Sequence, residues 1–138
     1  MKSNFISEKI PPLSGLNELF ITAQPFPHVV IDNFLHKDVF DKLLFEFENF
    51  YENKSKEGRL YTTQTESNKW SSQGLELPSY LKEIGDYLAS DEISNFLNQV
   101  TGFNNLKSIS GYNSKDVSFF SLMKKGSYLG PQLIICLI

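Results

Sequence analysis

The sequence predicts an α+β fold, in which an α-rich first part is followed by the start of a β-rich part. In three segments, 39–51, 81–88 and 93–100, apolar side chains recur every three or four positions, which is the period of an amphipathic helix. After Gly102 the period changes, because residues 116–124 alternate between two faces as in a strand. Helices and strands in separate parts of one 138-residue chain are typical of a single α+β domain.

Residues 1–24 are predicted to form an N-terminal arm that carries a short apolar segment at 16–21. Pro11 and Pro12 prevent a regular element before that segment, since proline fixes φ and has no backbone N–H to donate. After Pro27 the chain reads His-Val-Val-Ile-Asp. This β-branched stretch predicts a short strand, bounded by proline on one side and Asn33 on the other.

The clearest helix is predicted to follow, beginning at Asp38. Its apolar residues share one face: Val39, Phe40, Leu43, Leu44, Phe47, Phe50 and Tyr51. Asp38 and Asp41 lie near the start, where the helix dipole favours negative charge. Residues 53–74 are polar and are predicted to form a long loop, with an irregular strand considered near 60–62.

Two further helices are predicted on either side of residue 90. Pro78 suits a first turn, and Ser90 or Asp91 can cap the second helix. The apolar stripe of the first is Leu81, Ile84, Tyr87 and Leu88, and that of the second is Ile93, Phe96, Leu97 and Val100. Gly102 is a natural end for the second helix.

The last part of the chain is predicted to be β-rich. Residues 104–115 are rich in turn formers, residues 116–124 predict a strand, and residues 125–127 predict a turn. Strand is expected to continue at 128–130 and 133–138. The final residues carry no charge, so we expect them to leave an apolar strand edge open to a partner or to a second copy of the chain.

Composition excludes several classes of function. The net charge is −3 and the lysines are scattered, so no basic field is present to hold a nucleic acid. No apolar run approaches the length of about 20 residues that spans a bilayer. Cys136 is the only cysteine, which excludes an intrachain disulfide, and the N-terminus lacks the apolar core of a signal peptide. A cytoplasmic protein is therefore expected.

Candidates for acid–base, nucleophilic or metal chemistry are few, since the chain has two histidines. We interpret His28 as a structural histidine of the first strand. The sequence His36-Lys37-Asp38 spells the His-x-Asp that begins a non-haem iron triad, but Asp38 is better explained as a helix start. A metal site would also need a distant second histidine, for which His28 is the only candidate. Cys136 has no basic neighbour and is interpreted as a buried, inert thiol.

The remaining polar and aromatic candidates have ordinary interpretations beside functional ones. Gly126 and Gly130 do not form a phosphate loop, because no Lys-Ser or Lys-Thr pair follows them. Trp70 and Tyr61 fall in the polar segment, where they form either a recognition surface or ordinary loop aromatics. The pair of lysines at 124–125 is interpreted as a solvated turn.

Three stretches of the chain resemble a known family. PFPHVVIDNFLHKDVFDKLLFEF (residues 25–47) resembles the opening of 2-oxoglutarate/Fe(II)-dependent oxygenases of the prolyl 4-hydroxylase type. LPSYLKEIGDYLASDEISNFLNQVTGF (residues 77–103) resembles the helical support of that family. DVSFFSLMKKGSYLGPQL (residues 116–133) is similar to its first core strand and the turn into its iron-binding strand. The resemblance spans residues 25–133, and the order and spacing of the three stretches are its most specific feature.

The resemblance implies a double-stranded β-helix, or jelly roll, built on a helical support. Intact relatives are expected to hold Fe(II) through His-x-Asp/Glu and a distal His, and to pair an Arg or Lys with the carboxylate of 2-oxoglutarate. Ascorbate is a further possible requirement of such enzymes. Their expected reaction is the hydroxylation of a prolyl side chain in a protein.

The chain departs from the family pattern where the iron ligands should stand. Gln132 occupies the position of the histidine and Ile134 that of the carboxylate, so no catalytic, cofactor-binding or metal-binding residue is assigned to this chain. Arg59 lies upstream of the core strands and does not match the co-substrate cation. No cofactor is expected here. The chain is predicted to be a single incomplete domain over residues 1–138, with an arm (1–24), a strand plus helical support (25–103) and the first core strands (104–138).

Two functions follow as expectations. The first is that the chain is an N-terminal fragment of an oxygenase, truncated before the iron motif and inactive by itself. The second is a non-catalytic interaction module, or one half of a split protein, that pairs its exposed strand with a protein partner.

Overall fold

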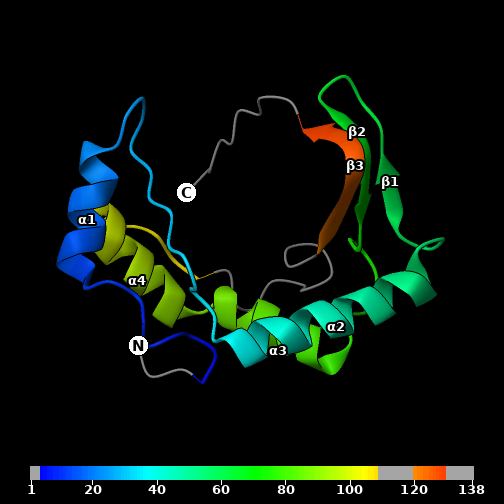
Figure 1. The fold of residues 1–138 in the computed structure, drawn as a ribbon, viewed down its shortest axis with the longest axis horizontal. Helices are drawn as coiled ribbons and strands as arrows, with labels where there is room; N and C mark the ends of the chain where they lie inside the picture. Colours follow the sequence, from blue (N-terminus) through cyan, green and yellow to red (C-terminus); the bar gives the residue numbers. More distant parts are fainter. Residues whose placement is uncertain (1–3, 109–119, 130–138) are drawn as a thin grey trace.

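The computed structural model describes residues 4–108 and 120–129, and these residues form four helices and three strands. In chain order they are α1 (Leu13–Thr22), α2 (Lys37–Lys54), β1 (Arg59–Tyr61), β2 (Glu66–Ser71), α3 (Ser79–Leu88), α4 (Asp91–Thr101) and β3 (Ser121–Leu129). Figure 1 shows α1 and α4 on one side of the molecule and the three strands on the other, with α2 and α3 between them. The combination of helices with a small antiparallel sheet confirms the predicted α+β class.

The start of α3 and both ends of α4 lie where the sequence signals stand. Pro78 directly precedes α3. The Ser90 hydroxyl accepts a hydrogen bond from the Ile93 N–H at 3.4 Å, so Ser90 caps α4 as predicted. At the other end of α4, Gly102 adopts φ 76°, a left-handed conformation that glycine takes without steric cost, and its N–H donates to the Asn98 carbonyl.

The polar segment at 53–74 is not one long loop, because most of it forms a β-hairpin. β1 and β2 pair antiparallel, with Leu60 opposite Trp70 and Tyr61 opposite Lys69. Thr63 closes the turn: its N–H donates to the Glu66 carbonyl at 2.8 Å, and its hydroxyl accepts from the Glu66 N–H at 3.1 Å. The irregular strand considered near 60–62 is the only part of this hairpin that the sequence indicated. The rest was not predicted, because its polar strands lack the apolar alternation of a half-buried sheet.

β3 completes a sheet with the order β1-β2-β3 and pairs antiparallel with β2. The register changes along the pair: Met123 is opposite Lys69, whereas Tyr128 is opposite Ser67. Residues 124–127 therefore oppose Asn68 alone and form a bulge. The predicted turn at 125–127 is this bulge inside one continuous strand. Of the other predicted strands, residues 116–119 and 130–138 lie outside the described part of the chain.

Residues 28–32 do not form the predicted strand. Their neighbour in the chain, Leu35, makes an isolated antiparallel bridge with Ile6 of the arm, supported by the Ser7 N–H donating to the Phe34 carbonyl. Val29 and Ile31 instead pack against a hydrophobic cluster, while Val30 is 76% exposed. Val29 and Ile31 therefore contribute to packing and not to a sheet. No described strand lies beside them with which they could form a ladder of hydrogen bonds.

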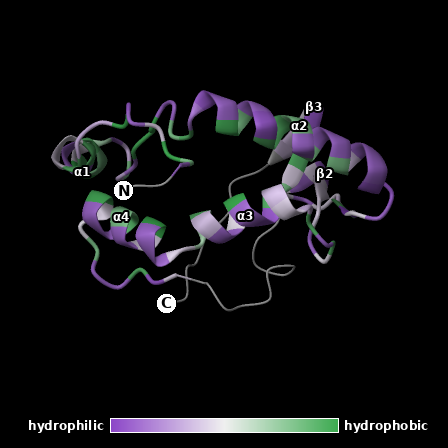
Figure 2. Cartoon of the chain, turned by 90° about the horizontal axis from the view of Figure 1, so that it is seen from below, coloured by the Kyte–Doolittle hydropathy of each residue, from purple (hydrophilic) through white to green (hydrophobic). Residues whose placement is uncertain are grey.

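Two hydrophobic clusters hold the described residues together. The first consists of Leu16 on α1 with Phe96 and Val100 on α4, and parts of the arm pack against it. The second consists of Phe50 on α2, Trp70 on β2 and Leu81 on α3. Figure 2 shows hydrophilic residues alternating with hydrophobic ones along α2, as expected for a helix with one packed face. None of the described helices has both the length and the apolar content needed to cross a membrane.

Candidate functional site

The two faces of the sheet differ in chemistry. Trp70 makes ring contacts with Phe47, Phe50 and Tyr51 of α2, so its face of the sheet meets the helix. Side chains alternate along a strand, and Lys69 with its cross-strand partners Tyr61 and Met123 therefore belongs to the opposite face. We call this second face, with Arg59, Tyr61, Glu66, Lys69 and Gln73, the polar face.

Gln73 organises one end of the polar face. Its side-chain carbonyl oxygen accepts from the Tyr61 hydroxyl at 2.7 Å and from the Arg59 Nη1 at 3.3 Å. The guanidinium of Arg59 also lies beside Gly74, where a Cβ would stand 3.8 Å from Nη2. Only one of the guanidinium's donors is engaged by Gln73, so the fork that pairs with a carboxylate is partly available.

The other cation of the polar face is neutralised. Lys69 Nζ lies 2.7 Å from a carboxylate oxygen of Glu66, and the two side chains are 22% and 12% exposed. The same Nζ lies 5.8 Å from the centre of the Tyr61 ring. Arg59, by contrast, forms no salt bridge with any other residue of the described ranges. It is therefore the charge on this face that a ligand would meet.

The two histidines lie away from the polar face. A ring nitrogen of His28 is 2.9 Å from the Phe26 carbonyl, and the side chain is exposed. The histidine is thus hydrogen-bonded, as the structural interpretation requires, but it is not part of a strand. His36 precedes α2 without capping it, and Asp38 follows in the first turn of that helix. Within residues 4–108 and 120–129, no three His, Cys, Asp or Glu side chains are grouped so that they could hold a metal ion.

Gln132 and Ile134, at which the resemblance predicts the iron-binding positions, lie outside the described residues, as does Cys136. Their chemistry can still be compared with the requirements of the metal. An amide is a poor substitute for imidazole, and an isoleucine side chain has no atom to donate. The residues present therefore do not fit Fe(II).

The pKa of Tyr80 departs clearly from its ordinary value. Burial raises the pKa above 10.0, and the negative charges of Asp38, Glu83 and Glu46 raise it further. The Tyr80 hydroxyl is 3.5 Å from the Val39 carbonyl, and Lys42 Nζ lies 3.9 Å from the centre of its ring. A phenol held protonated in this way joins α2 to α3 and is a poor general base near neutral pH.

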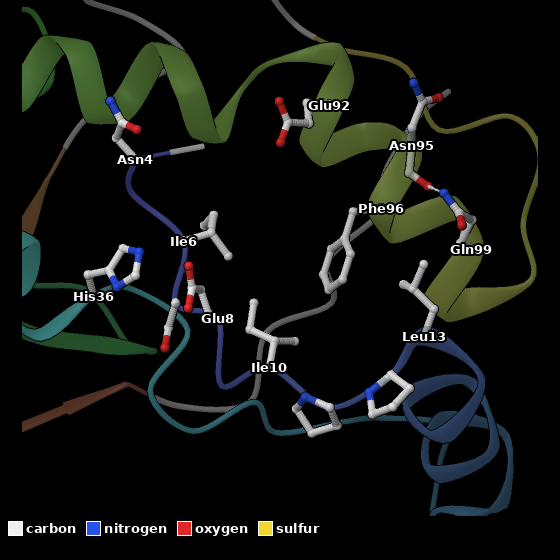
Figure 3. A pocket seen from close by; sticks show the side chains of 13 residues that line it. Asn4, Ile6, Glu8, Ile10, Leu13, His36, Glu92, Asn95, Phe96 and Gln99 are labelled. Carbon is white, nitrogen blue, oxygen red and sulfur yellow. Dashed lines mark hydrogen bonds between the residues drawn. The ribbon is translucent and has the colours of Figure 1, made fainter. Parts of the chain in front are cut away.

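A cavity of about 730 Å³ lies between the arm and α4 (Figure 3). Ile6, Ile10 and Phe96 supply apolar walls, and Glu8 and Glu92 bring carboxylates to it. One Glu92 oxygen accepts from the Tyr87 hydroxyl at 3.1 Å. The sequence did not indicate this cavity, because it arises where residues far apart in the chain meet.

Trp70 and Tyr61 have separate roles. Trp70 is 4% exposed and belongs to the second cluster, so it is a core residue and not part of a free loop surface. Tyr61 lies on the polar face with Arg59.

Comparison of the chain with protein-family models, with curated proteins and with solved structures finds no match. The fold and the polar face are therefore the basis for a functional proposal.

Proposed function

We propose that this chain supplies the helical support and the first core strands of an oxygenase of the 2-oxoglutarate/Fe(II), prolyl 4-hydroxylase type, and that it does not catalyse oxidation itself. The observation that supports this most is the two-faced sheet. α2 and α3 contribute to the hydrophobic cluster under Trp70, while the polar face carries Arg59, Tyr61 and Lys69. A jelly roll on a helical support needs this arrangement, with one face packed on helices and the other turned toward the centre of the barrel.

The same proposal makes the chain catalytically inactive. Gln132 and Ile134 replace the two neighbouring iron ligands of the family, and the described residues offer no other group of ligands. We propose that intact relatives use Fe(II), 2-oxoglutarate and ascorbate to hydroxylate prolyl side chains, and that this chain binds none of these cofactors. A cytoplasmic location goes with the proposal, since a chain with one cysteine has no intrachain disulfide to form in an oxidising compartment.

Activity can be measured directly. The purified chain is incubated with Fe(II), 2-oxoglutarate and ascorbate, and succinate is quantified with and without a prolyl peptide. The expected result is the same succinate signal as in a metal-free control. Metal-dependent succinate above that control would contradict the proposal, because it would require ligands other than those of the family.

A gain-of-ligand variant tests whether residues 132–134 occupy the family's iron-binding position. The double variant Gln132→His/Ile134→Asp is expected to bind Mn(II), a spectroscopic substitute for Fe(II), at least about tenfold more tightly than the natural sequence. Free Mn(II) is measured by electron paramagnetic resonance. The control is Leu133→His/Ile135→Asp, which places the same side chains one residue later. Equal affinity of the two variants would count against the assignment.

The gene offers an independent test. If residues 132–138 replace the family's sequence through a shift of reading frame, a His-x-Asp sequence is expected just past codon 131 in another frame. Sequencing of the locus decides this. Three frames without such a sequence would exclude the frameshift explanation, while leaving the fold assignment to be judged on the metal-binding variants.

A second candidate function is an interaction module that binds a partner strand. The observation that favours it is the place of β3, which among the described strands pairs with β2 alone. Met123 and Tyr128 on this strand are 37% and 51% exposed. A sheet edge with apolar side chains is a template for strand addition.

Light scattering after size-exclusion chromatography tests the second candidate. If β3 mediates self-association, the chain is a concentration-dependent oligomer, and Met123→Lys shifts it toward monomer because an edge lysine opposes pairing. Thermal melts should show that both proteins unfold cooperatively. A monomer at every concentration, with no protein recovered alongside it from its cell of origin, would remove this candidate.

A further inference from the structure

A second cavity, of about 480 Å³, lies where the C-terminal end of α2 meets the sheet. We call it the basic groove and define it by Tyr51, Leu60, Trp70, Leu122, Lys124 and Lys125. Its size falls within the range of about 300–1,000 Å³ that is usual for small-molecule sites. The groove is on the side of the sheet that faces α2, so it is separate from the polar face.

One wall of the basic groove is apolar and firmly held. The Trp70 indole N–H donates to the Ser55 carbonyl at 3.1 Å, and the indole meets the Tyr51 ring edge-on with centroids 5.0 Å apart. Leu60, which is 66% exposed, extends this wall to solvent. A ligand would therefore find a preformed apolar surface, with little loss of side-chain freedom on binding.

The opposite wall carries positive charge. Lys124 and Lys125 line the groove and are both exposed, and no acidic side chain is among the lining residues. Throughout the described ranges, neither lysine forms a salt bridge. Lys124 Nζ lies 5.5 Å from the centre of the Tyr51 ring, within the distance at which a cation and an aromatic ring attract each other. The Lys124 ammonium thus stands beside the aromatic wall, and neither lysine has a salt-bridge partner among the described residues.

An irregularity of the backbone places the lysines there. Both belong to the bulge of β3, in which Gly126 has φ 88°, and the residue opposite the bulge, Asn68, has φ 52°. Bulges redirect side chains, and glycine and asparagine are the residues that adopt the left-handed conformation most readily. The interpretation of residues 124–125 as a turn is therefore corrected, because they lie within β3, whereas both lysines are solvated as predicted.

We propose that the basic groove binds a small organic anion with an apolar ring, of the aromatic carboxylate class. The ring would lie against Tyr51 and Leu60, and the carboxylate would accept hydrogen bonds from Lys124 and Lys125. Both halves of this ligand are required, because the wall supplies apolar contact and the lysines supply charge. The proposal is independent of the oxygenase assignment, since it uses other residues on the other face of the sheet.

Binding is tested on the full chain with 2-naphthoate as the probe. Trp70 is the only tryptophan, so a single indole N–H resonance in the NMR spectrum reports on the groove. Titration with 2-naphthoate is expected to shift this resonance saturably. Neutral 2-naphthalenemethanol and ringless acetate should each bind at least about tenfold more weakly, which corresponds to about 1.4 kcal/mol. Equal binding of the neutral compound, or no saturable shift, would overturn the proposal.

A charge variant locates the site. Lys124→Gln/Lys125→Gln is expected to weaken 2-naphthoate binding about tenfold or more, since it removes both charged donors. Lys107→Gln is the control, because Lys107 is exposed and does not line the groove. Exposed lysines can be replaced without disturbing the core, and the melting temperature checks this. A double variant that stays folded and binds like the control would refute the assignment.

Discussion

Gly58 shows how a single small residue fixes a core side chain. A Cβ at this position would lie 2.1 Å from the Trp70 Nε1 and 2.2 Å from the next ring atom. The indole therefore packs directly on the backbone of Gly58, close to the Ser55 carbonyl that accepts its hydrogen bond. No pattern in the sequence marks this glycine, because the contact depends on how the hairpin folds over the end of α2.

Gly58→Ala is expected to lower the free energy of unfolding by about 1–3 kcal/mol, since the new methyl group must displace the indole. Urea denaturation followed by Trp70 fluorescence measures this. The control is Gly15→Ala on α1, where nothing lies within 4 Å of the new Cβ and alanine favours the helix by up to about 1 kcal/mol. If the two substitutions had the same effect, the close contact at Gly58 would be wrong.

Tyr80 gives a pH-dependent prediction. Its folded-state pKa lies above 10.0, so the folded protein holds the phenolic proton more tightly than the unfolded chain. The contribution to stability is fully present below pH 10 and is lost as the pH rises through the folded-state pKa. The natural chain and Tyr80→Phe are each titrated with alkali while the absorbance at 295 nm is recorded. The difference between the two curves should show one phenol with a midpoint above 10. A midpoint at or below 10 would contradict the assigned surroundings.

At the scale of elements, the local signals of α4 predict its ends correctly because they act within a few residues. Ser90 accepts a hydrogen bond from within the first turn of the helix, and Gly102 donates one to the last turn. Strand pairing is different, since it depends on partners far away in the chain. Residues 28–32 have strand-forming side chains without a described partner strand, whereas the polar β2 pairs on both of its edges.

The α4 cap can be tested by Ser90→Ala, which is expected to cost about 0.5–1 kcal/mol, the lower part of the usual range, because the hydrogen bond is long at 3.4 Å. Thermal and urea unfolding measure the change. Ser94→Ala is the matched control within the same helix, and it should be neutral or slightly stabilising because alanine is the better helix former. Equal losses for both would show that Ser90 does not act as a cap.

The candidate site was predicted only in part, because it too depends on residues that are far apart in the chain. Sequence alone identified the scarcity of histidines, whereas the interpretation of Gln132 and Ile134 as replacements for iron ligands stays a prediction. It could not bring Arg59 and Tyr61 together on Gln73, because that requires the register of the hairpin. Nor could it place the lysines of residues 124–125 beside Tyr51, since a bulge is not visible in an alternation of side chains.

At the scale of the whole molecule, the two hydrophobic clusters divide the elements between them. Leu16 belongs to the cluster of α1 and α4, and Leu81 to that of α2, α3 and the sheet. α3 and α4 are adjacent in the chain and contact each other, and they connect the two regions. Local stability is therefore expected to vary between the regions, although both lie in one chain.

Leu81→Ala is expected to cost about 2–5 kcal/mol, since Leu81 is completely buried. Amide hydrogen exchange should show the largest loss of protection in α2, α3 and the sheet. Leu16→Ala is the counterpart, with losses concentrated in α1 and α4. If either variant exposed all elements equally, the two clusters would form one cooperative unit.

The bulge in β3 also determines where this strand tolerates a change in length. Met123 and Tyr128 are five positions apart, while their partners Lys69 and Ser67 are two apart. Because side chains alternate with period two, inserting or deleting a residue within a regular ladder reverses the faces of everything beyond it. Within residues 124–127 no such reversal is required, since those residues have only Asn68 opposite them. This segment can therefore gain or lose a residue while the paired positions on either side keep their partners.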